Sequence, residues 1–203
     1  MLQRPYTRLK RKIRQVRHEY PRSIWTMFGG AFINTFGGSM VFPIFTLYFT
    51  HKFGLTLAEA GLLGTLFVVG GLIGGPLGGH LTDRFGRKGI MIFSLCAEAT
   101  FSLGMALAPS LPLLLIDIIL FGLTTPMFQP ASAATITDLV GPSRRGAAFG
   151  LMRIAHNAGV AIGPTVAALL LSIQRLPDGS LRSDAFLPLF VADAATSLIF
   201  AWI

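Results

Sequence analysis

Long stretches with almost no charged side chain are the feature that most limits how this chain can fold. Six of them contain either no Asp, Glu, Lys or Arg or a single such residue. A run of about 20 apolar residues is long enough to cross the hydrocarbon core of a membrane as a helix. Lipid offers the backbone no hydrogen-bond partner, so each stretch must be helical. We therefore expect an all-α membrane protein with six transmembrane helices, at about 24–50, 58–80, 89–108, 113–137, 146–172 and 185–203.

The composition agrees with this class of protein. Hydrophobic residues make up 52% of the chain and charged residues 13%, and that charged fraction is about half of what a soluble domain carries. Residues 1–22 are basic but lack the short apolar core and the cleavage site of a signal peptide, so we interpret the apolar run that follows as a retained first span. The chain thus divides into a basic tail over 1–22 and a six-helix bundle over 23–203.

Basic residues outside the predicted spans are divided unevenly between the two sides of the membrane. If the loops alternate from the N-terminus, one side carries 13 Lys and Arg, including 8 in residues 1–22, and the other carries 3. Lys and Arg concentrate in cytoplasmic loops, so we expect a cytoplasmic N-terminus in the cell inner (plasma) membrane. The net charge of +8 then reflects a tail that lies on anionic lipid headgroups, rather than one that binds nucleic acid.

Glycines are frequent in the second predicted span. Small residues four apart let membrane helices approach closely, because packing drives their association in lipid. We expect a tight helix interface at one or more of the glycine pairs with this spacing, which are Gly71 and Gly75, Gly74 and Gly78, and Gly75 and Gly79.

A glycine-rich group of charges, GGHLTDRFGRKG at Gly78–Gly89, separates the second and third predicted spans. Asp83 and Arg87 lie four residues apart and share a face if one helix continues through the motif. On an exposed surface such a pair contributes little to stability.

The motif resembles the loop 2–3 signature of the major facilitator superfamily: glycine, three residues, an acid, a base, any residue, glycine and two bases. The matching residues are Gly79, Asp83, Arg84, Gly86, Arg87 and Lys88. The six spans then correspond to the N-terminal half of that family's twelve-helix transporters, and a second six-helix half is expected after the apolar ending FAWI. The resemblance implies that Asp83, Arg87 and Asp138 cluster with a helix end of the second half and latch the outward-open state.

Two spans bear on how such a transporter is coupled. In the fifth, Gly159, Gly163 and Pro164 resemble the family's antiporter signature, with alanines where its last two glycines stand. This predicts a helix-packing seam of small residues. In the fourth, proton-coupled members often carry an arginine four residues before a glycine, whereas here Ile118 precedes Gly122.

Polar residues within the predicted spans are candidates for binding substrate or protons, because such groups are costly in lipid. The candidates are Asn34, Glu98, Asp117, Gln129, Arg153 and Asn157. Glu98 and Asp193 lie in spans that the resemblance places on the outside of the bundle. The alternative to a binding role for each is a neutral carboxylic acid that forms a hydrogen bond to a neighbouring residue. The alternative for Asp117 is contact with headgroup water.

The fifth and fourth spans give two further expectations. Arg153 and Asn157 lie four apart and should share a face toward a polar interior, whereas His156 should pack near the seam of small residues. Pro126 and Pro130 predict a kink in the fourth span.

We therefore interpret the chain as part of a secondary active transporter that resembles multidrug efflux members, with proton antiport of small hydrophobic or amphipathic compounds. The alternatives are a proton symporter or uniporter for a nutrient, and a non-transporting membrane scaffold or receptor. The sequence has no metal-ligand spacing, phosphate-binding loop or catalytic nucleophile arrangement, so we expect no enzyme, bound metal or cofactor.

Overall fold

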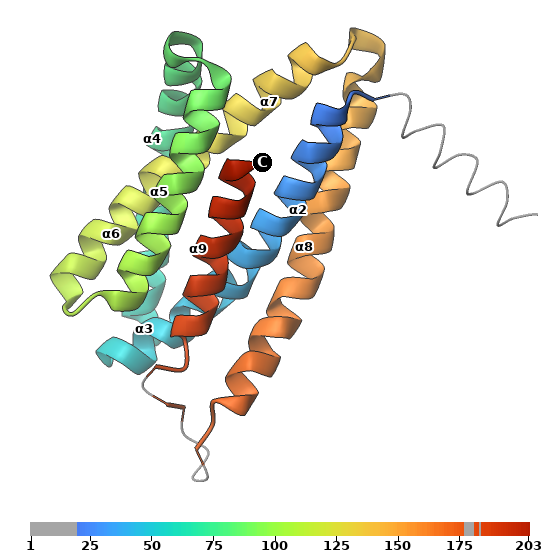
Figure 1. Cartoon of the computed structure of the whole chain (residues 1–203). Helices are drawn as coiled ribbons and strands as arrows, with labels where there is room; N and C mark the ends of the chain where they lie inside the picture. The colour runs from blue at the N-terminus through green and yellow to red at the C-terminus, as the bar shows by residue number, and fades with distance from the viewer. Residues whose placement is uncertain (1–19, 177–180, 183) are drawn as a thin grey trace, which may run out of the picture.

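A computed structural model describes residues 20–176, 181–182 and 184–203. The described residues form a bundle of helices, with one isolated bridge between Arg175 and Leu181 (Figure 1). Most of the expected tail, residues 1–19, lies outside the described residues. In chain order the elements are α2 (Arg22–Val41), η1 (Phe42–Ile44), α3 (Phe45–Phe53), α4 (Leu57–Phe85), α5 (Arg87–Leu107), α6 (Leu111–Thr124), η2 (Thr125–Met127), α7 (Phe128–Leu139), η3 (Pro142–Arg144), α8 (Arg145–Ile173) and α9 (Leu187–Trp202), where η marks a 3-10 turn.

Several of these elements join end to end into helices of membrane-spanning length. Five continuous helical stretches of the described chain are long and apolar enough to cross a membrane: Arg22–Phe53, Leu57–Phe85, Arg87–Leu107, Leu111–Leu139 and Pro142–Ile173. The sixth, α9, is apolar but has 16 residues, which gives it a length of about 24 Å, less than a typical hydrocarbon core.

The helices alternate in direction through the bundle. In Figure 1 the start of α2, the α4–α5 junction and the α7–α8 junction lie at one end, and α3, the end of α8 and the start of α9 lie at the other. The first end carries the basic residues of the glycine-rich motif together with Arg144 and Arg145. The division of Lys and Arg between the two sides of the membrane was counted on the assumption that the helices alternate in this way.

Specific residues fix where the helices begin and end. Thr56 and Glu59 form a reciprocal capping box at the start of α4, in which each backbone N–H bonds to the other side chain. Gly54 ends α3 with φ +66° and Gly86 ends α4 with φ +86°, conformations that favour glycine. Since α5 starts afresh at Arg87, no single helix runs through the motif.

Glycines at every fourth position of α4 form its contact with α6 and η2. Gly70, Gly74 and Gly78 are buried, and a Cβ atom at Gly70 would lie 2.9 Å from the backbone carbon of Gly122. The expected pair Gly74 and Gly78 therefore lies in the interface. Gly75 does not, since nothing lies within 4 Å of where its Cβ would be.

The end of the bundle around α3 is held by aromatic packing and by two hydrogen bonds to α5. The rings of Tyr48 and Phe190 meet edge to face at 4.8 Å between centroids. The Tyr48 hydroxyl donates to the Met105 carbonyl, and Lys52 Nζ donates to the Ala106 carbonyl at 2.6 Å. The Ala106 carbonyl, in the last turn of α5, thereby gains a partner that its helix does not supply.

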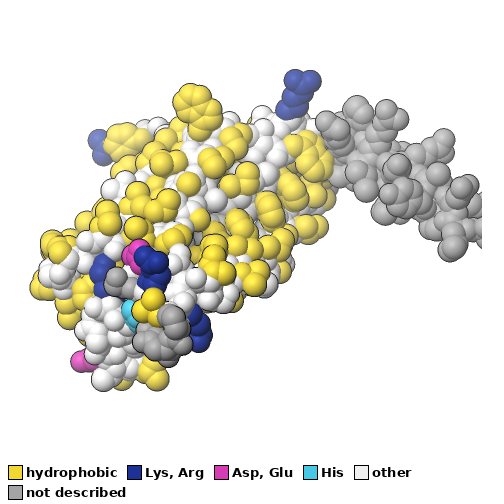
Figure 2. Space-filling model, turned by 60° about the horizontal axis from the view of Figure 1, so that its bottom comes forward, with side chains coloured by type: hydrophobic (Ala, Val, Ile, Leu, Met, Phe, Trp, Pro, Cys, Tyr) yellow, Lys and Arg dark blue, Asp and Glu magenta, His cyan; other side chains and the backbone are white. Residues whose placement is uncertain are grey.

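Apolar side chains cover most of the face visible in Figure 2. Large hydrophobic residues such as Leu62, Leu72 and Ile73 of α4 are exposed. Extensive apolar exposure of this kind is unfavourable in water and is normal for a surface in contact with lipid.

We predict that Gly70→Ala destabilises the bundle by about 1–3 kcal/mol, because its methyl group would overlap backbone atoms that cannot move away. Gly75→Ala is the matched control, since its methyl group meets open space and alanine has the higher helix propensity. Thermal unfolding of the detergent-solubilised chain measures both. Equal stability of the two variants would contradict this interface.

Candidate functional site

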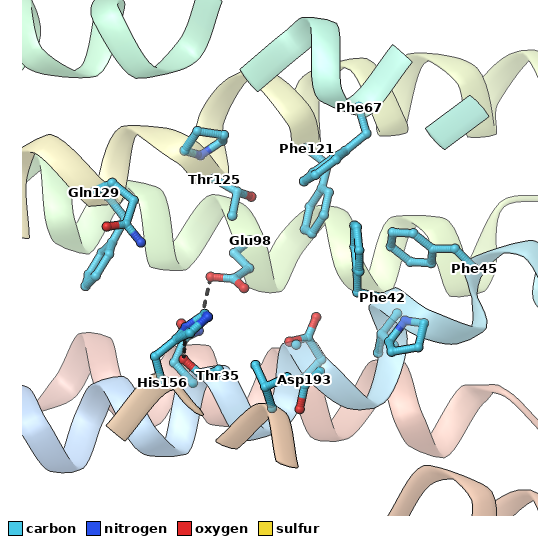
Figure 3. A pocket seen from close by; sticks show the side chains of 18 of the residues that line it. Thr35, Phe42, Phe45, Phe67, Glu98, Phe121, Thr125, Gln129, His156 and Asp193 are labelled. Atoms are coloured by element: carbon cyan, nitrogen blue, oxygen red, sulfur yellow. Dashed lines mark hydrogen bonds between the residues drawn. The ribbon is translucent and has the colours of Figure 1, made fainter. Parts of the chain in front are cut away.

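A cavity of about 590 Å³ lies between the helices near the middle of the bundle (Figure 3). One part of its wall is aromatic and includes Phe42, Phe45, Phe67 and Phe121, which come from four different elements. The rings contact one another, with 5.3 Å between the centroids of Phe67 and Phe121. Most of the surface that a bound molecule would meet here is apolar.

Asn34 lies in the polar part of the wall and joins three helices. Its Nδ2 atom in α2 donates to Glu98 Oε2 of α5 at 3.1 Å and to Ser197 Oγ of α9 at 2.9 Å. Glu98 is 9% exposed and lines the cavity. The expected hydrogen bond of Glu98 to a neighbour is present, and the carboxyl group also borders the interior.

Asp193 of α9 is the second acid in the wall. Its Oδ2 atom accepts a hydrogen bond from Ser102 Oγ at 2.7 Å. Its Oδ1 atom has no hydrogen-bond partner among the described residues, although the residue is 1% exposed. Both acids are bonded to neighbouring residues, as their alternative role predicts, and both side chains also line the cavity. They pass α2 at Gly38, where glycine leaves room for them.

The fourth span bends at the cavity, as its prolines predict. The 3-10 turn η2, over Thr125–Met127, interrupts the helix between α6 and α7. Thr125 and Gln129 both line the cavity, and Thr125 Oγ1 has no partner among the described residues. The turn also presents the Thr124 and Thr125 carbonyls to Ser94 Oγ, at 2.7 and 3.0 Å.

The fifth span places His156 near the seam of small residues, as expected, but leaves Arg153 and Asn157 outside this cavity. His156 lines the cavity and its Nδ1 atom lies 3.4 Å from Thr35 Oγ1. Arg153 and Asn157 are exposed and lie outside the lining of this cavity. The sequence could not fix the rotation of a helix that is small or apolar on several faces.

Asp117 also lies outside this cavity. Its carboxyl group packs against Gly104 of α5, where a Cβ atom would lie 3.0 Å from Asp117 Cγ. It is therefore a contact between α5 and α6 and is not placed to meet a molecule in the cavity.

Gly159 and Gly163 of α8 pack against α2. A Cβ atom at either position would lie 2.8 Å from a backbone atom of Phe36, and Ser39 Oγ donates to the Gly159 carbonyl at 3.0 Å. Pro164 follows directly and lines the cavity. These residues bring α8 close enough to α2 to place His156 in the cavity wall.

The glycine-rich motif lies at the end of the bundle and makes a different ion pair from the one its spacing predicts. Arg87 pairs with Asp138 and donates to the Ala134 carbonyl at 3.3 Å. Among the residues that the structure describes, Asp83 has no ion pair within 4 Å. The break at Gly86 is the reason, because Asp83 and Arg87 then belong to different helices.

The other motif residues make separate contacts. Arg84 stacks over the ring of Phe85 at 5.3 Å from its centroid. Lys88 lines a separate cavity of about 520 Å³ together with Arg22 and Asp138. Gly79 lies next to α7, with Pro130 Cβ 3.9 Å from where its own Cβ would be.

Sequence reasoning missed the aromatic wall. The signal available was the spacing of Phe42 and Phe45, which share a helical face three residues apart. The partners Phe67 and Phe121 come from distant parts of the chain, and no local pattern connects them.

The comparisons with known proteins agree on one family. The family model described as "Major Facilitator Superfamily" matches residues 27–203. The chain is 33% identical over 161 residues to "Multidrug resistance protein MdtH" of Klebsiella pneumoniae, covering 78% of this chain and 39% of that protein. It is 31% identical over 157 residues to a "Na(+), Li(+), K(+)/H(+) antiporter" of Planococcus maritimus, covering 75% of this chain and 37% of that protein. The chain thus spans less than half the length of these relatives.

The fold is similar to that of solved transporters. The inward-open xylose transporter XylE from E. coli aligns with a TM-score of 0.71 at 19% identity, over 89% of this chain and 46% of that one. At this identity the likeness concerns the fold alone, and it confirms the expected six-helix membrane bundle.

We predict that Asn34→Ala lowers the free energy of unfolding by about 1–3 kcal/mol, because it removes the donor that two buried acceptors share. Asn157→Ala is the matched control, since Asn157 is exposed on α8. Chemical unfolding in detergent compares the two. Similar losses for both variants would show that the network around Asn34 contributes no stability.

For the ion pair at the motif, we predict a coupling free energy below about 1 kcal/mol between Arg87→Gln and Asp138→Asn, since both partners are partly exposed. Added salt should reduce it further. A double-mutant cycle measures this coupling, and a second cycle with Asp83→Asn and Arg87→Gln should give a value near zero. A larger coupling in the second cycle would contradict the observed pairing.

Proposed function

The chain belongs to the Major Facilitator Superfamily, and from this premise we propose that it is half of a secondary active transporter that works by alternating access. It is an integral membrane protein, and its proposed cargo is a small hydrophobic or amphipathic compound that leaves the cell in exchange for protons. The partner is a second six-helix half, and substrate binds between the two halves near the middle of the membrane.

The observation that carries this proposal is the cavity at the middle of the bundle. Its volume of about 590 Å³ suits a drug-sized molecule, and an apolar wall with a few polar groups is typical of small-molecule sites. Among the described residues that line it, none is Lys or Arg. This favours neutral or cationic cargo over anions.

Efflux and proton exchange are supported by the relatives and by the acids in the wall. One relative is named a multidrug resistance protein and another a cation/proton antiporter. Glu98 is the first proposed proton carrier, because it is buried and borders the cavity. Asn34 and Gln129 are the proposed substrate contacts from α2 and α7. The family's coupling arginine has no counterpart here, since Ile118 is a core residue that is 3% exposed.

The remaining candidates lie away from this cavity. Arg153 and Asn157 are exposed on α8, and we propose that they contribute to the site only across the boundary with the second half. In this proposal Asp117 does not contact substrate, and its side chain serves as a packing contact between α5 and α6.

The glycine-rich motif is the proposed conformational gate. Arg87 and Asp138 are already paired within this half, and Asp83 is exposed beside them. We propose that Asp83 meets a helix end of the second half and that this contact forms and breaks as the halves move. The gate lies on the cytoplasmic side of the inner membrane, with the basic tail on the lipid headgroups.

Two alternatives predict different results. A nutrient symporter or uniporter has the same fold, and the likeness to a xylose transporter does not favour it because it concerns the fold alone. A membrane scaffold or receptor would keep the bundle but would move no substrate.

We expect an inward proton gradient to drive an amphipathic dye out of cells or vesicles that contain the protein encoded by the whole reading frame of this chain. The assay follows dye fluorescence after a pH jump, with a proton ionophore as the control. Dye accumulation driven by inward protons would support symport instead. No dye movement under any gradient would contradict transport of this class of cargo.

We further expect Asp83→Asn to slow dye transport at least several-fold without lowering the unfolding temperature of the bundle, because Asp83 has no ion pair within the described half. Arg175→Gln, at an exposed position that follows α8 and lies outside the motif, is the control for loss of a charge. If Asp83→Asn transports normally but loses an assembly partner, the scaffold alternative is correct.

A further inference from the structure

Two carboxyl groups from different helices border one small region of the cavity (Figure 3). A Cβ atom at Gly38 of α2 would lie 3.5 Å from Asp193 Oδ1 and 3.8 Å from Glu98 Oε1. The other oxygen of each group is held in place, Glu98 Oε2 by Asn34 and Asp193 Oδ2 by Ser102. These hydrogen bonds orient the two groups so that their remaining oxygens lie around one position above the glycine.

This position lacks a positive charge. Asp193 Oδ1 has no donor among the described residues in spite of nearly complete burial, and an unpaired buried acceptor is costly. Two carboxylates that border one space also repel each other. Among the described residues that line the cavity, no Lys or Arg is present to offset them. Within this half, the compensating charge can come only from a proton or from a bound cation.

The surroundings of the pair indicate which cation fits. The cavity is much larger than a bare alkali ion, and the aromatic wall of Phe42, Phe45, Phe67 and Phe121 continues from the acids. Aromatic faces attract cations, and apolar walls favour a molecule that carries its charge on a hydrophobic body. A lipophilic organic cation satisfies both conditions, with its charge near the acids and its body against the rings.

We propose that Glu98 and Asp193 form one binding position for which a proton and a lipophilic organic cation compete. The inference rests on the proposed function, and it assigns the exchange of a proton for the cation to this half of the transporter. When the cation binds, the O–H bond of the protonated carboxyl breaks and the proton passes to water in the cavity. One positive charge arrives and one leaves, so the charge of the site does not change.

The proposal gives a direction for the effect of pH. At low pH the carboxyl pair holds its proton and cation binding weakens, whereas at higher pH binding strengthens. His156 of α8 is the other titratable side chain among the described lining residues, while the lining from α2, α4, α6, η2 and α7 contains none. A protonated His156 would also repel a cation, so the variant His156→Gln separates its contribution from that of the acids.

The test is equilibrium binding of tetraphenylphosphonium, in detergent, to the purified protein encoded by the whole reading frame of this chain. Tetraphenylborate, which has the same shape and the opposite charge, is the matched probe. We expect Glu98→Gln and Asp193→Asn each to weaken tetraphenylphosphonium binding about tenfold or more, a loss of about 1.4 kcal/mol. Binding to the wild-type chain should strengthen as pH rises and should release protons into a weakly buffered solution.

Controls separate loss of charge from loss of fold. Asp117→Asn removes an acid outside the cavity and should leave binding unchanged. Glu98→Asp retains the charge and should bind better than Glu98→Gln, and circular dichroism should show the same helix content in all variants. Unchanged binding in both acid variants, equal binding of tetraphenylborate, or no pH dependence in His156→Gln would each overturn the proposal.

The same experiment distinguishes this inference from the proposed function. If the dye assay shows proton-driven efflux but the chain binds tetraphenylphosphonium without using the acids, only the exchange site is wrong. If binding depends on the acids but no transport occurs, the site stands and the function as an efflux transporter fails.

Discussion

Hydrocarbon cannot form hydrogen bonds, and this constraint determines where the polar groups of the bundle lie. Asn34, Glu98 and Ser197 satisfy one another across three helices, and Ser102 satisfies one oxygen of Asp193. Each side chain would be costly on the lipid face. The polar groups that hold the helices together are therefore the same groups that give the cavity its chemistry, and stability and binding share a small set of residues.

Glycine provides the space in which this arrangement forms. Gly70, Gly74 and Gly78 let α4 approach α6 and η2, while Gly159 and Gly163 let α8 approach α2. In both contacts the backbones come close enough to hold the helices firmly without large side chains between them. The aromatic side chains are left to line the cavity, where their rings contact one another.

The sequence was sufficient for the fold class but not for the orientation of each helix. Charge-free runs indicated helices in a membrane, and the prolines of the fourth span indicated its bend, which the structure shows at Thr125–Met127. The rotation of α5, α8 and α9 was not predictable, because a helix that is apolar on most faces carries no clear amphipathic signal. This is why Asp193 was assigned to packing although it also lines the cavity, while Arg153 and Asn157, which lie outside the cavity, were assigned to a polar interior. Local spacing was also insufficient at the motif, where the backbone of Gly86 separates Asp83 from Arg87.

That separation has a consequence for the proposed gate. Asp83 lies in the last turn of α4, whose carbonyl groups already make this end negative, so its carboxylate is unfavourable there. Arg87 belongs to α5 and is paired with Asp138, so it is not free to offset the charge of Asp83. A positive group or a helix N-terminus from outside this half would remove the repulsion. Arg87 thus holds Asp138 in a pair within this half and leaves Asp83 exposed, so Asp83 is the acid that gains most from the contact proposed for the gate.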